Sequence, residues 1–84
     1  MSYEIELTNY ALKSLKKVPS HSSLRIRDAL KKLAENPFMG EKLTGKQAYR
    51  VRVGDYRLIY EIHDNILVVL VVNIGHRKDI YKGK

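Results

Sequence analysis

Residues 49–60 read YRVRVGDYRLIY, two alternating strands joined by a Gly54-Asp55 turn, and this stretch decides the fold. A two-residue turn at this position predicts an antiparallel hairpin whose register follows from the side-chain period of two. The predicted pairs are Val53 with Tyr56, Arg52 with Arg57, Val51 with Leu58, Arg50 with Ile59 and Tyr49 with Tyr60. One face of the hairpin is then apolar, and the other carries three arginines.

The three arginines are unexpected on grounds of stability. Like charges directly opposite each other in an antiparallel pair are unfavourable by a few tenths of a kcal/mol or more. Placing Arg52 opposite Arg57, with Arg50 nearby on the same face, therefore brings no gain in folding. We expect an anionic group to lie between Arg52 and Arg57.

The first half of the chain predicts one strand and a helical hairpin. Residues 3–7 alternate apolar and polar side chains, as a half-buried strand does. Thr8 or Asn9 is expected to cap a first helix that ends at Pro19. A second helix is predicted from Ser20 to the Asn36-Pro37 pair, with apolar side chains at helical spacing on one face.

The second half predicts a loop and a meander. Residues 37–47 contain two glycines and a proline without periodicity and indicate a loop. Residues 66–72 are β-branched and apolar on both faces, which is typical of a central strand. If Asp64-Asn65 forms a two-residue turn, Leu67 joins Val69 and Val71 on the apolar face and Val72 lies opposite Arg57. Arg77 would leave the sheet beside the arginines.

Together these elements predict a single domain over residues 1–84 in the α+β class, ordered strand, two helices and a three-stranded antiparallel meander. The helices should cover the apolar face of the sheet. The opposite face should stay open and hold the arginines and the C-terminal segment.

The composition favours a polyanionic partner. Sixteen Lys and Arg against nine Asp and Glu give a net charge of +7 and a pI near 9.8. Cysteine is absent, which excludes disulfides and thiolate metal sites. The longest apolar run, residues 66–72, is far shorter than the roughly 20 residues of a membrane span. We expect a cytoplasmic protein without membrane contact.

Few catalytic patterns are present. The histidines at positions 21, 63 and 76 lack metal-ligand spacing, so neither a metal nor another cofactor is expected. The arginines suit phosphate binding and stabilisation of developing charge. His76, after Gly75, could act as an acid or base. Arg77 and Tyr81, taken alone, would equally fit a basic tail.

The whole chain resembles the RelE toxins of the RelE/ParE superfamily. The resemblance is carried by residues 49–62, the valine-rich strand, GHRKDIY at 75–81, LAENP at 33–37 and KLTG at 42–45. It implies the same fold and the toxin of a type II toxin-antitoxin pair. Such a toxin inhibits translation as an endoribonuclease that enters the ribosomal A site. It cleaves mRNA there by attack of the RNA's own 2′-hydroxyl, without a metal.

The resemblance also assigns roles to individual residues. It implies that Arg57 stabilises the phosphate, that Arg77 assists protonation of the leaving group and that Tyr81 orients a base. Arg50 and Arg52 occupy positions where well-studied members carry lysines, and arginine cannot act as a base at neutral pH. The base is left open among solvent polarised by the arginines, which we favour, His76, and a weakly catalytic protein.

Partners follow from the same resemblance. Lys46, Lys78 and Lys82 are expected to make ancillary contacts to RNA. A RelB-like antitoxin should wrap and neutralise the toxin, and only that complex should bind operator DNA. Two alternatives stay open: a ParE-like toxin that inhibits DNA gyrase without catalysis, and a basic RNA-binding module.

Overall fold

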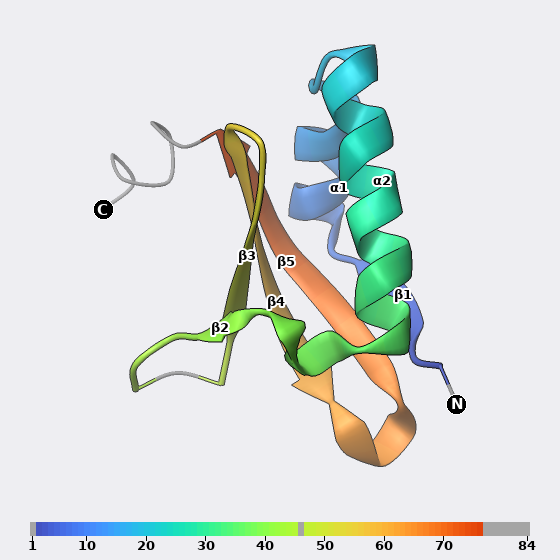
Figure 1. The fold of residues 1–84 in the computed structure, drawn as a ribbon, viewed down its shortest axis with the longest axis vertical. Helices are drawn as coiled ribbons and strands as arrows, with labels where there is room; N and C mark the ends of the chain where they lie inside the picture. The colour runs from blue at the N-terminus through green and yellow to red at the C-terminus, as the bar shows by residue number, and fades with distance from the viewer. Residues whose placement is uncertain (1, 46, 77–84) are drawn as a thin grey trace.

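One five-stranded sheet, covered on one face by two helices, forms the fold in the computed structural model, which describes residues 2–45 and 47–76 (Figure 1). The elements are β1 (Glu4–Leu7), α1 (Asn9–Lys16), α2 (Ser20–Glu35), the 3₁₀ turn η1 (Pro37–Met39), β2 (Glu41–Lys42), β3 (Tyr49–Val53), β4 (Tyr56–His63), the 3₁₀ turn η2 (Asp64–Ile66) and β5 (Val68–His76). The strand order is β1-β5-β4-β3-β2. The predicted α+β class, with both helices on one face, is confirmed.

The helices begin and end where local chemistry requires. The hydroxyl of Thr8 caps α1 by accepting a hydrogen bond from the Ala11 amide at 3.1 Å. The sequence between the helices contains Pro19, and α2 ends one residue before Asn36. Both helices pack against the sheet, and the buried core consists of Ala11, Leu15, Ile26, Leu30, Leu33, Leu58, Tyr60, Val69, Val71 and Ile74.

The β3–β4 hairpin has the predicted register. Val53 pairs with Tyr56, and Arg52 pairs with Arg57. Gly54 has a φ of 60°, a left-handed conformation that favours glycine and lets the turn close in two residues. The pairing of β3 with β4 is therefore encoded locally.

The predicted turn at Asp64-Asn65 is wrong. The chain forms η2 instead, and Leu67 leaves it with a φ of 54°, so that His63 pairs with Val68. The longer turn moves the register by two positions, and an irregularity between Ile59 and Tyr60 moves it by one more. The partner of Arg57 is consequently Gly75 and not Val72, three positions further along β5.

The predicted loop over residues 37–47 contains structure that the sequence pattern did not reveal. Strand β2 pairs antiparallel with β3, with Glu41 opposite Arg50. The segment before β2 is attached to the core by Tyr60, whose hydroxyl donates to the Pro37 carbonyl at 2.7 Å and accepts from the Gly40 amide at 3.2 Å. A Cβ atom at Gly40 would collide with that hydroxyl. A buried side chain of a distant strand thus positions β2.

We expect Tyr60→Phe to lower the free energy of unfolding by about 1–3 kcal/mol, because the mutation leaves the Pro37 carbonyl and the Gly40 amide without their buried partner. Equilibrium denaturation in urea measures this change. Tyr49→Phe is the matched control, since the Tyr49 ring stacks on Tyr60 at 5.7 Å but its hydroxyl has no hydrogen-bond partner among the described residues. Equal stability of the two variants would contradict the anchoring role of Tyr60.

Candidate functional site

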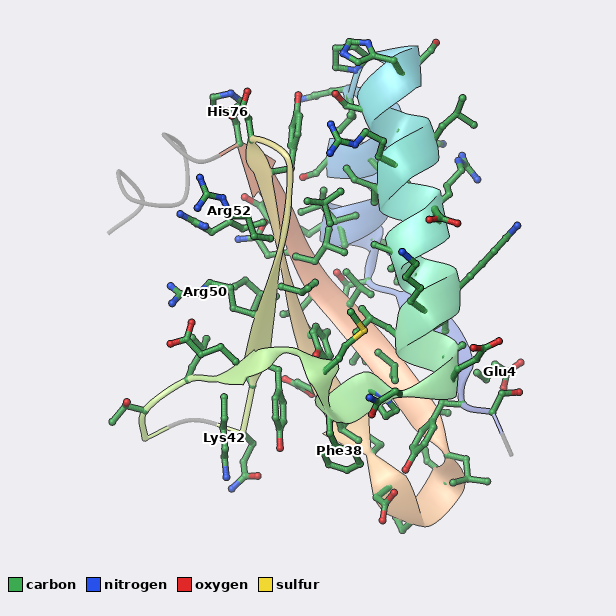
Figure 2. All side chains as sticks on the ribbon, viewed as in Figure 1. Glu4, Phe38, Lys42, Arg50, Arg52 and His76 are labelled. Carbon is green, nitrogen blue, oxygen red and sulfur yellow. The ribbon has the colours of Figure 1, made fainter. Side chains whose placement is uncertain are left out.

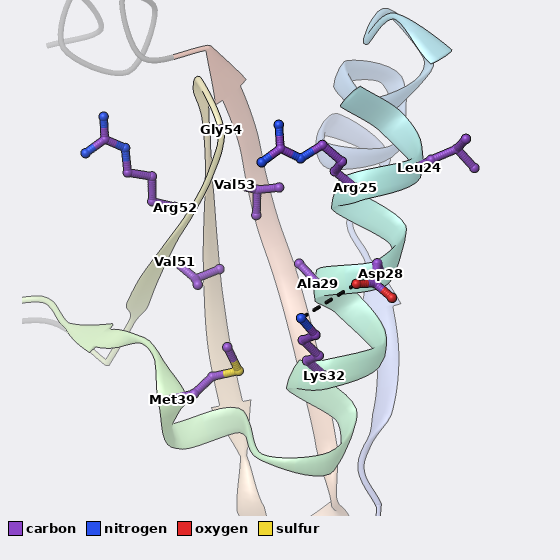
Figure 3. Close-up of a pocket in the computed structure, with 10 residues that line it drawn as sticks. All are labelled: Leu24, Arg25, Asp28, Ala29, Lys32, Met39, Val51, Arg52, Val53 and Gly54. Atoms are coloured by element: carbon purple, nitrogen blue, oxygen red, sulfur yellow. Dashed lines mark ion pairs between the residues drawn. The ribbon is translucent and has the colours of Figure 1, made fainter. Parts of the chain in front are cut away.

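Three guanidinium groups lie on the sheet face opposite the helices. Val51 and Val53 point toward α2, whereas Arg52 between them points to the other side (Figure 3). Figure 2 shows Arg50 and Arg52 extending from β3 on the side away from both helices. The direct pairing of Arg52 with Arg57 puts the third arginine on this same face. We call Arg50, Arg52 and Arg57 the arginine face.

The three arginines differ in their contact with water. Arg52 is exposed, the side chain of Arg50 is 31% exposed, and Arg57 is only 8% exposed. Arg57 lies on β4 between Arg52 of β3 and Gly75 of β5, so it occupies a central position of the sheet. A buried charge is costly to desolvate unless it is paired or hydrogen-bonded. The arginine face therefore combines one guanidinium held within the protein with two that reach toward solvent.

A carboxylate from β2 completes this face. The Arg50 Nη2 atom donates to Glu41 Oε1 at 2.7 Å. The hydrogen bond from Arg50 lowers the pKa of Glu41, and the positive charges of Arg50 and Arg57 lower it further. Glu41 thus places an anionic group beside Arg50, whereas the anion expected between Arg52 and Arg57 stays a prediction.

Glu41 is not among the residues predicted from the sequence, because the pattern of its segment indicates a loop. The available signal was indirect. Arginines facing one another across a hairpin indicate a nearby anion, and Glu41 precedes the hairpin by only a few residues. Only the pairing of Glu41 with Arg50 across β2 and β3 makes the assignment specific.

His76 lies on the other face of the sheet. It pairs with Tyr56, and their rings meet edge to face with centroids 5.4 Å apart. Together with Tyr10 and Lys13 of α1, they line a hollow on the helical side. His76 therefore does not share a face with Arg57, and the geometry favours no acid or base role for it there.

The remaining predicted site residues lie outside the described part of the chain. These are Lys46, Arg77, Lys78, Tyr81 and Lys82. Their expected roles stay predictions.

Within residues 2–45 and 47–76, no three His, Cys, Asp or Glu side chains are grouped so that they could hold a metal ion. No helix in that part of the chain is long and apolar enough to span a membrane.

Comparison with known proteins identifies the family. The sequence model for "ParE toxin of type II toxin-antitoxin system, parDE" matches residues 5–81. The chain belongs to the RelE/ParE toxin superfamily. Toxin RelG of Mycobacterium tuberculosis is 31% identical, over 98% of this chain and 99% of the relative. The mRNA interferase toxin RelE of Escherichia coli is 29% identical, over 93% of this chain and 86% of the relative.

Solved structures of this superfamily have the same fold. The toxin-antitoxin complex RelBE2 of Mycobacterium tuberculosis contains a chain with a TM-score of 0.84 and 27% identity, covering 92% of this chain and 100% of that one. In the intact Escherichia coli RelBE complex the TM-score is 0.83 with 28% identity, covering 89% and 96%. The arrangement of α1, α2 and the sheet is therefore the one found in the solved structures of this superfamily.

A groove of about 410 Å³ separates α2 from β3 in this RelE/ParE toxin (Figure 3). Its lining includes Leu24 and Met39, which are exposed apolar side chains. Arg25 of α2 reaches across toward the hairpin turn. Its Nη1 atom is so near Gly54 that a Cβ atom on that residue would lie only 3.4 Å away. This groove lies on the helical side of β3, and the arginine face lies on the other.

Proposed function

We propose that this type II toxin is a ribosome-dependent mRNA endoribonuclease. The observation that carries the proposal is the ion pair between Glu41 and Arg50 beside Arg52 and Arg57, which brings a carboxylate and three guanidinium groups onto one face. The Escherichia coli relative RelE is named an mRNA interferase, which supports the same activity. The protein would act in the cytoplasm, where the ribosome presents mRNA.

The proposed reaction is an internal transesterification. The 2′-oxygen of a ribose bonds to the adjacent phosphorus while its proton leaves, and the bond from phosphorus to the 5′-oxygen breaks. The products are a 2′,3′-cyclic phosphate and a 5′-hydroxyl, which gains a proton. The chain must therefore accept one proton, deliver one and stabilise the negative charge of the phosphorane.

The arginine face can meet most of these needs. Arg57 is fixed in the centre of the sheet and would stabilise the phosphorane, while Arg50 and Arg52 would bind the flanking phosphate oxygens. Like any glutamate with an ordinary or lowered pKa, Glu41 is ionised at neutral pH, so its carboxylate can accept the 2′-hydroxyl proton. By the resemblance, Arg77 would assist protonation of the leaving oxygen and Tyr81 would orient a base.

The arginines should contribute more to the rate than Glu41 does. The positive charges that keep Glu41 ionised also reduce its affinity for a proton, and general-base catalysis weakens as that affinity falls. Electrostatic stabilisation of the phosphorane carries no such penalty and is commonly the largest catalytic contribution.

We also propose a RelB-like antitoxin as the neutralising partner. The solved relatives include toxin-antitoxin complexes, and a net charge of +7 suits an acidic segment that folds on binding. Operator DNA would then be bound through that complex.

The rival is a ParE-like toxin that inhibits DNA gyrase, which the description of the matching family model favours. Purified protein incubated with ribosomes programmed with mRNA separates the two. New 5′ ends within A-site codons are expected. Intact mRNA together with gyrase-linked DNA breaks would overturn the proposal, and intact mRNA with RNA binding alone would leave a non-catalytic module.

A further inference from the structure

A basic hollow lies on the helical side of the sheet, away from the arginine face. It has a volume of about 440 Å³ and lies between α1 and the ends of β4 and β5. Its lining includes the basic and aromatic side chains of Tyr10, Lys13, Lys17, Tyr56 and His76. We call this hollow the α1 pocket. Neither the proposed cleavage nor the comparisons assign a role to it.

The wall of the α1 pocket that α1 provides consists of a row of side chains along one face of the helix. Tyr10, Lys13 and Lys17 are spaced at i, i+3 and i+7, so they share one face of α1 and its C-cap. Lysines four residues apart repel each other, and among the described residues neither Lys13 nor Lys17 makes an ion pair. The row is therefore suited to an anionic ligand.

The pocket also offers aromatic surfaces. Tyr56 and His76 form one wall, with their rings edge to face at an interplanar angle of 87°. Tyr10 is 65% exposed, so much of its side chain is open to solvent. Cationic side chains beside exposed aromatic rings are the combination with which proteins bind single-stranded nucleic acid, because phosphates meet the cations and bases stack on the rings.

Building on the proposed action on RNA, we propose that the α1 pocket binds a nucleotide of single-stranded RNA. Lys13 and Lys17 would hold its phosphates, and its base would stack on Tyr10. Tyr56 and Arg57 are consecutive in β4 and point to opposite faces of the sheet. The nucleotide in the α1 pocket is thus distinct from the one that is cleaved.

Fluorescence anisotropy with a short, fully 2′-O-methylated oligoribonucleotide tests the phosphate contacts, because this RNA lacks the attacking hydroxyl. Lys13→Ala/Lys17→Ala is expected to weaken binding by about 10-fold or more and to reduce the salt-dependence slope by about 1.4, or ~0.7 per phosphate contact on a single strand. Lys16→Ala/Lys31→Ala removes the same charge from exposed positions outside the pocket. Equal affinity and slope in the two double variants would overturn the proposal.

Two further measurements test that the ligand is RNA. Tyr10→Ala should weaken binding by about 10-fold through lost stacking, whereas Tyr10→Phe should bind like the parent. Polyglutamate carries negative charge without bases. If polyglutamate binds as tightly as the oligoribonucleotide and responds equally to Lys13→Ala/Lys17→Ala, the pocket is a site for an acidic polypeptide and the RNA assignment is wrong.

The proposal that the α1 pocket binds RNA and the proposal of mRNA cleavage can be rejected independently of each other. Intact mRNA on programmed ribosomes, with RNA binding still lost in Lys13→Ala/Lys17→Ala, would reject the cleavage and support the pocket. Cleaved mRNA, with RNA binding unchanged in that variant, would reject the pocket and support the cleavage.

Discussion

Arg57→Ala is expected to reduce cleavage of ribosome-bound mRNA by about 100- to 1000-fold, the usual cost of removing one donor that stabilises a developing oxyanion. Arg57 is 8% exposed and lies between Arg52 and Gly75, so no neighbouring arginine can move into its place without disturbing the sheet. The measurement is single-turnover cleavage of mRNA on programmed ribosomes, with new 5′ ends mapped by primer extension.

Two controls separate chemistry from folding. Arg57→Lys keeps the charge but loses the planar guanidinium, so we expect intermediate activity from a folded protein. Arg27→Ala removes a positive charge from an exposed position on α2 and should leave the rate nearly unchanged. If Arg57→Ala is folded by circular dichroism and cleaves at the parental rate, Arg57 does not stabilise the phosphorane. Loss of activity is likewise expected for Arg77→Ala, whose role rests on the resemblance.

Glu41→Gln is expected to lower the cleavage rate by about 100-fold, the lower part of the range for general acid-base catalysis. The amide cannot accept the 2′-hydroxyl proton, although it can still accept a hydrogen bond from Arg50. Binding of a non-cleavable RNA should therefore be retained. Glu6→Gln, on an exposed position of β1, is the matched control.

The pH dependence tests the same assignment. A base acts only when it is deprotonated, so the parental rate should fall as the pH drops through the pKa of Glu41. Because Arg50 and Arg57 lower that pKa, the fall should lie below the ordinary range of a glutamate, and Glu41→Gln should abolish it. Faster cleavage or tighter RNA binding in Glu41→Gln would instead show that Glu41 competes with phosphate for Arg50.

Much of the fold follows from local sequence. The alternation over residues 49–60 and the Gly54-Asp55 turn suffice to specify the β3–β4 register. A two-residue turn fixes the first pair of residues, and every further pair follows by counting outward from it. The cap at Thr8 and the ends of α1 and α2 are equally local, since capping and proline act within a single helical turn. Two further features depended on tertiary contacts.

The register of β5 needed contacts that its own sequence does not encode. Residues 66–72 are apolar on both faces, so the sequence offers no alternation that would favour one register over another. The η2 turn and the irregularity beside Tyr60 decide the register instead, and they bring Gly75 opposite Arg57 and His76 opposite Tyr56. The placement of His76 away from the arginine face follows from that shift.

The sequence by itself determined that Arg50, Arg52 and Arg57 share one face, because strand alternation and a two-residue turn leave no other arrangement. The tertiary structure decided that the Glu41 carboxylate lies beside Arg50 on this face. Glu41 lies opposite Arg50 in the pairing of β2 with β3, and Tyr60, a buried residue of β4, binds Pro37 and Gly40 and so helps to hold the segment before β2 in place. Such a contact joins residues 20 positions or more apart, beyond the range of any local sequence pattern.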